Sequence, residues 1–425
     1  MSSSRCPQCG QALPAWASAC PNCRALIQPE LSRRAVLFGL GLGGLTALTA
    51  LTGGFVRVGS QRSAGVLRSS GSRMLQPQMP PAPGTKLYIY RNHTDAVNAV
   101  EWSPTSTRIA SASDDKTVHV WDATTGSHVL MYKGHAGAVN AVAWSPDGTK
   151  MASASGDKTV HVWNAASGVH LLTYKGQSGA VNAVAWSSDN LHLVSGGQDG
   201  TAQVWNAATG AHLLTYKGHA GSVSGVAWSH DGKYIVSCGT DQTVQVWEAA
   251  TGKLVHTYTG HTAAVHQVRW SPDGLLIASC SDDSSVRVWS VATGKLVHTY
   301  RGHTKAVESL DWSPNGKLIV SGGQDETVQV CEAVTGTFIY SYKDQAESER
   351  APRCTSAALC TDAGSSQETG RLSGARGADA AAPAPPDVVV RGVRGVAWAP
   401  NGNYTASGGY NRTVTVSSSE GWGSN

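Results

Sequence analysis

The sequence has little phenylalanine and little net charge, and each shortage limits the classes of protein to which the chain can belong. Only 3 of its 425 residues are Phe, against 14 Trp and 48 Gly. Such a skew is typical of a single motif, containing Trp and Gly, that is copied many times along a chain. The 33 basic and 29 acidic side chains leave a net charge of only +4. This charge is too small and too dispersed for binding to a phosphate backbone, so no nucleic-acid partner is expected.

The sequence also lacks the cysteine pattern of a disulfide framework. Five of its 9 cysteines are scattered, and this odd remainder argues against systematic pairing: Cys238, Cys280, Cys331, Cys354 and Cys360.

The other four cysteines form two C-x-x-C pairs near the N-terminus. Two such pairs supply four thiolates to a tetrahedral metal ion. The predicted ligands of a structural zinc ion are Cys6, Cys9, Cys20 and Cys23. Residues 1–28 resemble a short bacterial-type zinc ribbon, in which the metal stabilises a segment too short to build a core. A redox dithiol is the alternative interpretation.

A repeat occupies most of the chain. The tryptophans Trp121, Trp163, Trp205, Trp247 and Trp289 follow one another at intervals of 42 residues. Within one copy, residues 138–144, 150–155, 159–164 and 170–175 alternate between apolar and polar side chains and are separated by turn signals. Each repeat therefore predicts four short strands, and this period with four strands is typical of a β-propeller.

The repeated motifs resemble those of the WD-repeat β-propeller family. The resemblance is carried by Gly134-His135, the SPDG turn at 145–148 and the dipeptide Trp121-Asp122, and it extends over residues 85–416. It implies an all-β, seven-bladed propeller. The inner strands are expected to begin near Val97, Val139, Val181, Val223, Val265, Val307 and Val393.

The last blade has no outer strand after it, whereas residues 85–90 form an outer-strand pattern with no inner strands before it. We therefore expect residues 85–90 to pair with the last blade and close the ring, since closure removes exposed sheet edges. A linker is predicted at 59–84, an inserted loop at 344–390 and a short tail at 417–425. The insertion is interpreted as a lid or partner tail, or as disordered surface sequence.

A histidine, a serine, an aspartate and a tryptophan recur at fixed spacing in the full copies. A Ser-His-Asp set suggests a hydrolase, but a catalytic triad needs one exposed nucleophile and these residues are repeated four times. The family resemblance implies instead a buried hydrogen-bonded network that braces each blade. The predicted network residues are His93, Ser111, Asp115, Trp121, His135, Ser153, Asp157, Trp163, His219, Ser237, Asp241, Trp247, His261, Ser279, Asp283 and Trp289.

Four substitutions interrupt this network: Gln177 stands in place of His, Cys331 in place of Trp, Asn411 in place of Asp and Ser417 in place of Trp. Because two of the four fall in the seventh blade, that blade is predicted to be the weakest.

The resemblance also implies a partner-binding top face. Its positions in this chain are Asn98, Asn140, Asn182, Ser224, His266, Glu308, Asp114, Gln198, Thr240, Asp282 and Gln324. These residues are polar and include none of the Trp, Tyr and Arg side chains that usually anchor interfaces. His266 and Glu308 break the uniformity of neighbouring copies and are the best candidates for partner contacts.

Residues 35–56 contain no charged side chain. As a helix, such a segment would be roughly 30 Å long, enough to cross the hydrocarbon core of a bilayer. The preceding Ser32-Arg33-Arg34 resembles a bacterial twin-arginine export signal, and no A-x-A cleavage site follows it. Residues 32–58 are therefore predicted to be an export signal or, preferably, a retained single-pass membrane anchor, with the propeller outside the cytoplasm.

Together these features predict a non-enzymatic, membrane-tethered scaffold that binds a protein or peptide through a monomeric propeller. A sensory or regulatory module of a signalling assembly is the alternative. A hydrolase or lyase is disfavoured, because the sequence predicts no non-repeated cluster of carboxylates or histidines at the central opening.

Overall fold

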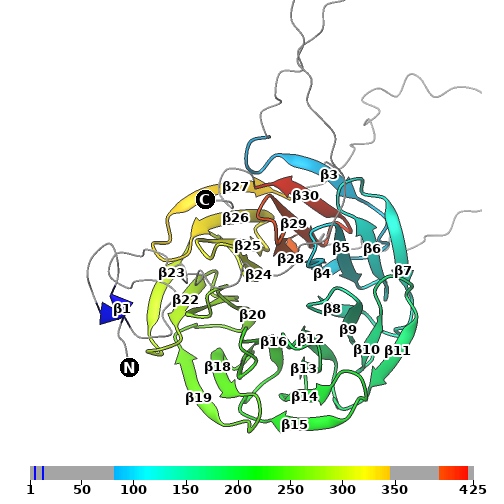
Figure 1. Cartoon of the computed structure of the whole chain (residues 1–425). Helices are drawn as coiled ribbons and strands as arrows, with labels where there is room; N and C mark the ends of the chain where they lie inside the picture. The colour runs from blue at the N-terminus through cyan, green and yellow to red at the C-terminus, as the bar shows by residue number, and fades with distance from the viewer. Residues whose placement is uncertain (1–3, 6–11, 14–80, 345–391, 420–425) are drawn as a thin grey trace, which may run out of the picture. The chain divides into compact units, whose positions relative to one another are not determined.

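The computed structural model describes residues 4–5, 12–13, 81–344 and 392–419. All regular elements of this part of the chain are β-strands. A two-stranded sheet pairs β1 (Ser4–Arg5) with β2 (Ala12–Leu13). The remaining strands form seven four-stranded antiparallel sheets arranged as blades in a ring (Figure 1). The prediction of an all-β, seven-bladed propeller is confirmed.

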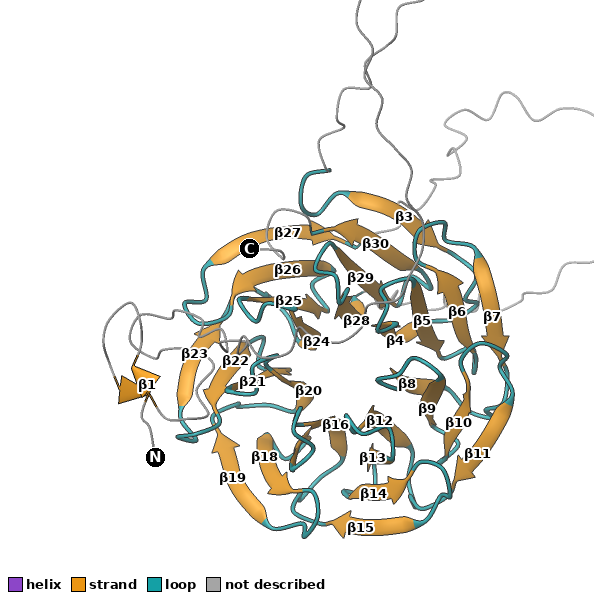
Figure 2. Cartoon of the chain, in the orientation of Figure 1, coloured by secondary structure: helices purple, strands orange, loops and turns teal. Residues whose placement is uncertain are grey.

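The blades follow one another along the chain, and within each blade the strands run from the inner to the outer edge (Figure 2). Blade one comprises β4 (Val97–Trp102), β5 (Arg108–Ser113), β6 (Val118–Asp122) and β7 (His128–Tyr132). Blade two comprises β8 (Val139–Trp144), β9 (Lys150–Ser155), β10 (Val160–Asn164) and β11 (His170–Tyr174). Blade three comprises β12 (Val181–Trp186), β13 (His192–Gly197), β14 (Ala202–Asn206) and β15 (His212–Tyr216).

Blade four comprises β16 (Val223–Trp228), β17 (Tyr234–Gly239), β18 (Thr243–Glu248) and β19 (Leu254–Thr259). Blade five comprises β20 (Val265–Trp270), β21 (Leu276–Ser281), β22 (Val286–Ser290) and β23 (Leu296–Tyr300). Blade six comprises β24 (Val307–Trp312), β25 (Leu318–Gly323), β26 (Thr327–Glu332) and β27 (Phe338–Lys343). Blade seven comprises β28 (Val393–Trp398), β29 (Tyr404–Gly409), β30 (Val414–Ser418) and, as its outer strand, β3 (Lys86–Tyr90).

The ring is closed by pairing between the two ends of the repeat region. Strand β3 lies antiparallel to β30, with Tyr90 opposite Val414, and the two strands lie side by side in Figure 1. The pairing continues beyond the strand, because Gly84 N donates to Ser418 O at 2.8 Å. The closing strand expected at residues 85–90 is present as β3, and no blade is left with an incomplete sheet.

Tight turns fix the register of the strands. In the turn between β8 and β9, Gly148 N donates to Ser145 O at 2.8 Å, and Ser145 Oγ donates to Asp147 Oδ1 at 2.6 Å. Gly148 has a φ of 69°, a left-handed conformation that glycine adopts without a steric penalty. The repeated S-P-D-G signal therefore specifies a turn whose last position has a positive φ, which Ser106 and Asn190 adopt at the same place in two other repeats.

The hydrophobic core lies between neighbouring blades. Tyr132, on the outer strand of blade one, packs with Met151 and Trp163 of blade two in one buried cluster. Similar clusters join the other neighbours. Each blade therefore buries a face against the next, and the core is shared between neighbouring blades and not confined within single sheets.

The predicted membrane localisation is wrong: no helix in the part of the chain that the structure describes is long and apolar enough to cross a bilayer. The segment 35–56, on which that prediction was based, lies outside the described residues, as do the rest of 32–58 and the predicted linker up to residue 80. The four predicted zinc ligands and residues 345–390 of the insertion also lie outside them.

Candidate functional site

The repeated His, Ser, Asp and Trp residues form one connected network in blade two. His135 Nδ1 lies 2.9 Å from Asp157 Oδ2, and His135 Nε2 lies 2.8 Å from Ser153 Oγ. Trp163 Nε1 donates to Ser153 Oγ at 3.3 Å. Asp157 Oδ2 also accepts the backbone N–H of Ala136 at 2.9 Å. The network therefore ties the middle strands of the blade to the loop that enters it.

Blades four and five contain the same complete network, with all its contacts at 2.8–3.1 Å: His219, Ser237, Asp241 and Trp247 in blade four, and His261, Ser279, Asp283 and Trp289 in blade five.

The other blades contain partial versions. In blade one, His93 contacts Asp115 and Ser111 at 2.7 and 2.8 Å, but Trp121 Nε1 has no hydrogen-bond partner among the described residues. In blade three, Gln177 Nε2 donates to Ser195 Oγ at 3.2 Å and so takes the place of histidine. Blade six keeps the histidine contacts through His303, Ser321 and Asp325, which were not among the predicted residues, but has Cys331 in place of Trp.

The environment of this network does not suit catalysis. Ser153 is fully buried and already receives a hydrogen bond from Trp163. Burial lowers the pKa of His135. Burial alone would raise the pKa of Asp157, but hydrogen bonds from Thr159 and His135 outweigh it and lower that pKa to about 2. The pair is therefore a neutral imidazole bound to a carboxylate, with no room for a substrate beside the serine.

Blade one also brings His119 next to the network. Ligand atoms of His93, Asp115 and His119 all lie within 4.8 Å of one another, as in a metal site. However, both ring nitrogens of His93 already contact Asp115 and Ser111, and His119 Nδ1 lies 2.9 Å from the Tyr90 hydroxyl. Hydrogen bonds thus satisfy the cluster without a metal ion.

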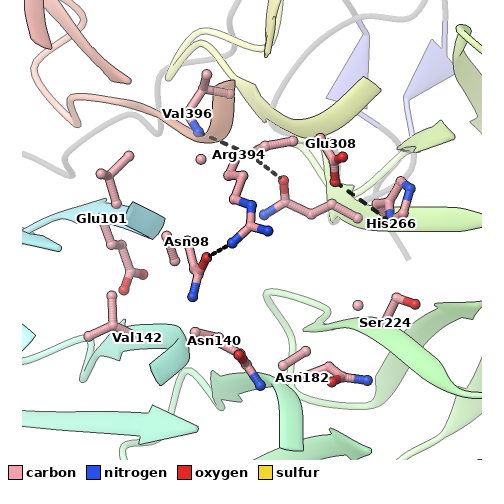
Figure 3. A pocket seen from close by; sticks show the side chains of 18 of the residues that line it. Asn98, Glu101, Asn140, Val142, Asn182, Ser224, His266, Glu308, Arg394 and Val396 are labelled. Carbon is pink, nitrogen blue, oxygen red and sulfur yellow. Dashed lines mark hydrogen bonds and ion pairs between the residues drawn. The ribbon is translucent and has the colours of Figure 1, made fainter. Parts of the chain in front are cut away.

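A cavity of about 500 Å³ opens at the centre of the propeller, and its wall is formed by the inner strands of all seven blades (Figure 3). The second residue of each inner strand lines the cavity. We call these seven the ring residues: Asn98, Asn140, Asn182, Ser224, His266, Glu308 and Arg394. Six of them were predicted top-face positions, and the structure places them around one opening.

One side of this ring is uncharged. Asn140 Nδ2 donates to Val181 O at 2.9 Å, and Asn182 Nδ2 donates to Val223 O at 3.0 Å. Each asparagine thereby joins its blade to the next one. The Oδ1 atoms of Asn140 and Asn182 receive no hydrogen bond from the described residues, so they remain available as acceptors at the opening.

The opposite side of the ring is charged. His266 Nε2 lies 2.7 Å from Asp282 Oδ1, and its Nδ1 lies 3.9 Å from Glu308 Oε2. Gln324 Nε2 donates to Glu308 Oε1 at 2.6 Å. The two residues singled out from the sequence, His266 and Glu308, are therefore neighbours, and Asp282 and Gln324 support them. Of the predicted positions outside the ring, Asp114 lines the cavity, whereas the other four are not among the residues that line it: Gln198, Thr240, Asp282 and Gln324.

Arg394 was not predicted from the sequence. Its Nη1 contacts Asp114 Oδ2 at 3.0 Å and donates to Asn98 Oδ1, as Figure 3 shows for the latter contact. Its guanidinium lies 3.9 Å from the centre of the Tyr410 ring, within cation–π range. At the ring position and in the turn beside it, blade seven thus supplies an arginine and an aromatic side chain that the other blades do not have at these positions. Comparing Val393-Arg394 with Val97-Asn98 would have revealed the substitution.

Three inner strands carry a further charged residue, three positions after the ring residue. The fifth residue of these strands is alanine in four blades but Glu101, Arg269 and Asp311 in the others. Glu101 and Arg269 line the cavity, and Asp311 lies within electrostatic reach of both. The prediction that no unrepeated carboxylate cluster exists at the central opening is therefore wrong. In the sequence, this cluster shows only as three replacements of the alanine that the other four blades have at this position.

Both carboxyl groups bind the backbone of the neighbouring blade. Glu101 Oε2 accepts Trp144 N–H and Asp311 Oδ2 accepts Trp398 N–H, each at 2.8 Å. Burial raises the pKa of Glu101 to about 8, against the opposing effect of Arg269. Burial likewise raises the pKa of Asp311. The two groups therefore join adjacent blades, and neither is held beside a nucleophile of the described residues.

The comparisons with known proteins concern the repeats. The sequence matches the family described as "WD domain, G-beta repeat" at residues 84–122, 126–164, 168–206, 210–248, 252–290, 294–332 and 390–416. It is also 46% identical over 46 residues to the ribosome biogenesis protein BOP1 homologs of Drosophila virilis and Drosophila grimshawi. The corresponding match to the Drosophila melanogaster protein is 44% identical over 46 residues. These matches cover 11% of this chain and only 6% of the length of each relative.

Proposed function

Because this chain belongs to the WD-repeat family, we propose that it is a non-enzymatic interaction scaffold that binds a protein or peptide segment at the ring residues. Propellers of this family generally bind protein partners. One observation carries the proposal: blades two, four and five repeat the same buried network, whereas the seven ring residues around one cavity include Asn, Ser, His, Glu and Arg. Repeated residues specify the fold, and the differing residues are free to specify a partner.

The charges at the ring favour a partner with a basic side chain. Asp282 and Glu308 flank His266 on one side of the opening, and His266 and Glu308 are partly exposed there. The guanidinium of Arg394, in contrast, is already paired with Asp114. An incoming ammonium or guanidinium group would meet the carboxylates of Asp282 and Glu308, and the Oδ1 atoms of Asn140 and Asn182 would accept further hydrogen bonds from the partner.

The experiment is affinity capture by the whole chain, comparing the wild type with a His266→Ala/Glu308→Ala variant. The double variant is expected to lose a specific partner while keeping its melting temperature. His212→Ala/Glu248→Ala provides a matched control, because both residues lie outside the cavity lining and the pair removes the same types of side chain. Equal capture by all three proteins would contradict binding at the ring.

The similarity to the BOP1 homologs supports only the scaffold function. Its 46 residues are close to the 42-residue repeat interval, so the match is about one repeat long. A role in ribosome biogenesis would need a likeness beyond one repeat, and the proposal does not include it.

A further inference from the structure

Blade five places on the wall of the central cavity an arginine that has no partner among the described residues. Arg269 is the fifth residue of β20, lines the cavity and is partly exposed. No hydrogen bond or ion pair joins its guanidinium to another of the described residues. Glu101 and Asp311 lie within electrostatic reach of it but are not paired with it. Because a guanidinium group carries five N–H donors, Arg269 brings a set of free donors to the cavity.

The carboxyl oxygens near Arg269 are already occupied by the backbone. Asp311 Oδ2 accepts the N–H of Trp398 at 2.8 Å, and its Oδ1 accepts the N–H of Trp312 at 2.9 Å. One oxygen of Glu101 is occupied in the same way. Neither carboxyl group can therefore turn towards the guanidinium without giving up a backbone hydrogen bond.

A glutamine beside Arg269 adds a further donor. Gln267 lies on the same strand and also lines the cavity. Its Oε1 accepts the N–H of Leu310 at 2.8 Å and the hydroxyl of Ser309 at 2.7 Å. These contacts identify Nε2 as its other end, and Nε2 makes no hydrogen bond to the described residues. This part of the wall is rich in free N–H donors, and it suits a ligand that is rich in acceptors.

The distribution of charge along the cavity favours a ligand with charges of both signs. Asp114 and Arg394 compensate each other. Glu308 then leaves an acidic group at the ring, whereas Arg269 places a basic group further along the inner strands. His266 and Arg269 are three residues apart on β20, so their backbones lie no more than about 10 Å apart. A short extended segment can span this distance.

We propose that the guanidinium of Arg269 binds a carboxylate of the partner segment whose basic group lies at His266 and Glu308. The inference rests on the proposed function, because it concerns the same partner. The planar fork of arginine matches the two oxygens of a carboxylate in a bidentate contact, and Gln267 Nε2 is a further donor on the same strand. The carboxylate belongs either to the chain end of the partner or to an acidic side chain.

The neighbouring carboxyl groups oppose such a ligand only weakly. Burial raises the pKa of Glu101 to about 8, so this group is mostly neutral at pH 7. The two N–H groups that Asp311 accepts offset part of its charge. A cavity of about 500 Å³ has the size of pockets that enclose small ligands. It can therefore take a short chain segment, and not a folded domain.

Pools of short peptides, offered to the immobilised whole chain at pH 7, test this site. Three pools of acetylated random pentapeptides all include lysine and arginine. The first ends in a free carboxylate and lacks acidic side chains, the second ends in an amide and includes them, and the third ends in an amide and lacks them. The wild type is expected to retain about tenfold more peptide from the first or the second pool than from the third. The pool that is retained identifies the source of the carboxylate.

A conservative variant tests the arginine itself. Arg269→Lys keeps the positive charge beside Glu101 and Asp311 but loses the planar fork. Its melting temperature should stay close to that of the wild type, while retention of the carboxylate-bearing peptides falls about tenfold. Arg108→Lys at the start of β5 is the matched control, because Arg108 does not line the cavity, and it should retain these peptides as the wild type does.

Equal retention of all three pools by the wild type would overturn the carboxylate site, and this comparison requires no variant. Unchanged retention by a folded Arg269→Lys would overturn it as well. If His266→Ala/Glu308→Ala abolished equal retention of the three pools, binding at the ring would stand and only the carboxylate site would fall. No retention from any pool would also remove the carboxylate site, whereas the capture of whole partners described above judges the scaffold function separately.

Discussion

The ring of Tyr132, on the outer strand of blade one, lies parallel to the indole of Trp163 in blade two, with ring centres 4.7 Å apart. Comparable stacks join Tyr174 to Trp205 and Tyr216 to Trp247, both at 4.5 Å. Each stack links the edge of one blade to the core of the next. These tryptophans therefore stabilise the boundary between blades as well as their own sheet.

Trp163→Ala is expected to destabilise the protein by about 3–5 kcal/mol, the usual cost of truncating a buried aromatic side chain. It removes the stack with Tyr132 and the hydrogen bond to Ser153 together. Chemical denaturation measures the change. Trp398→Ala at the inner edge provides a comparison, because Trp398 Nε1 donates only to a carbonyl of its own turn. A loss below about 1 kcal/mol for Trp163→Ala would contradict the role assigned to the stack.

Asp157→Ala is expected to lower stability by roughly 1.5–3 kcal/mol, the cost of removing a charge-assisted hydrogen bond. His135 loses its carboxylate partner and the N–H of Ala136 loses its acceptor. Thermal unfolding measures the effect, with the exposed Lys253→Ala as control. Partner capture per folded molecule should not change, and a loss of capture without a loss of stability would point to a direct role for Asp157.

Glu101→Gln is expected to stabilise the protein at alkaline pH. The folded pKa of about 8 lies above the ordinary value of 4.5, so the wild type loses stability as the pH rises from about 4.5 to 8. The glutamine amide oxygen still accepts the N–H of Trp144 but carries no charge. The gain should be on the order of 2 kcal/mol or more above pH 8 and should vanish near pH 4. Melting curves across this range measure it, and a gain independent of pH would contradict the assignment.

Arg394→Ala is expected to change partner capture more than stability. The side chain is partly exposed and its ion pair with Asp114 lies at the cavity opening, where such pairs contribute about 1 kcal/mol or less. Removal of the arginine leaves Asp114 unpaired and makes the ring more acidic. A basic partner segment should therefore bind more tightly, as measured by titration calorimetry with the captured partner. Weaker binding would show that Arg394 itself contacts the partner.

The zinc site remains a prediction from the sequence. We expect one zinc ion per chain by elemental analysis of the whole protein, lost in Cys6→Ser/Cys9→Ser. The control Cys354→Ser/Cys360→Ser should retain the metal, since these cysteines do not form a C-x-x-C pair. Zinc-free wild-type protein, purified without chelators, would rule out the site.

The regular part of the architecture was predictable because the repeats carry it. The interval between Trp121 and Trp163, the turn at Gly148 and the outer-strand pattern at residues 85–90 predict blade number, strand number and closure. The cavity was only partly predictable. Its ring follows from the second residue of each inner strand, but Arg394 lies after an insertion that interrupts the repeat spacing.

The charged residues at the fifth position of three inner strands were not predicted, for a different reason. Glu101, Arg269 and Asp311 lie on three separate inner strands, in blades one, five and six. Only ring closure brings such distant residues around one opening, and the sequence spacing of individual repeats does not show it.

Pairing of β3 with β30 also affects how the chain folds during synthesis. Strand β3 is made before any blade, yet its partner is the last strand of the propeller. Until β30 leaves the ribosome, β3 has no sheet to join and the growing stack of blades exposes an uncovered sheet face at each end. Closure is therefore a late, long-range step, of the kind that folds slowly and exposes the chain to aggregation. A molecular chaperone that shields those two faces would protect the nascent propeller until its last strand arrives.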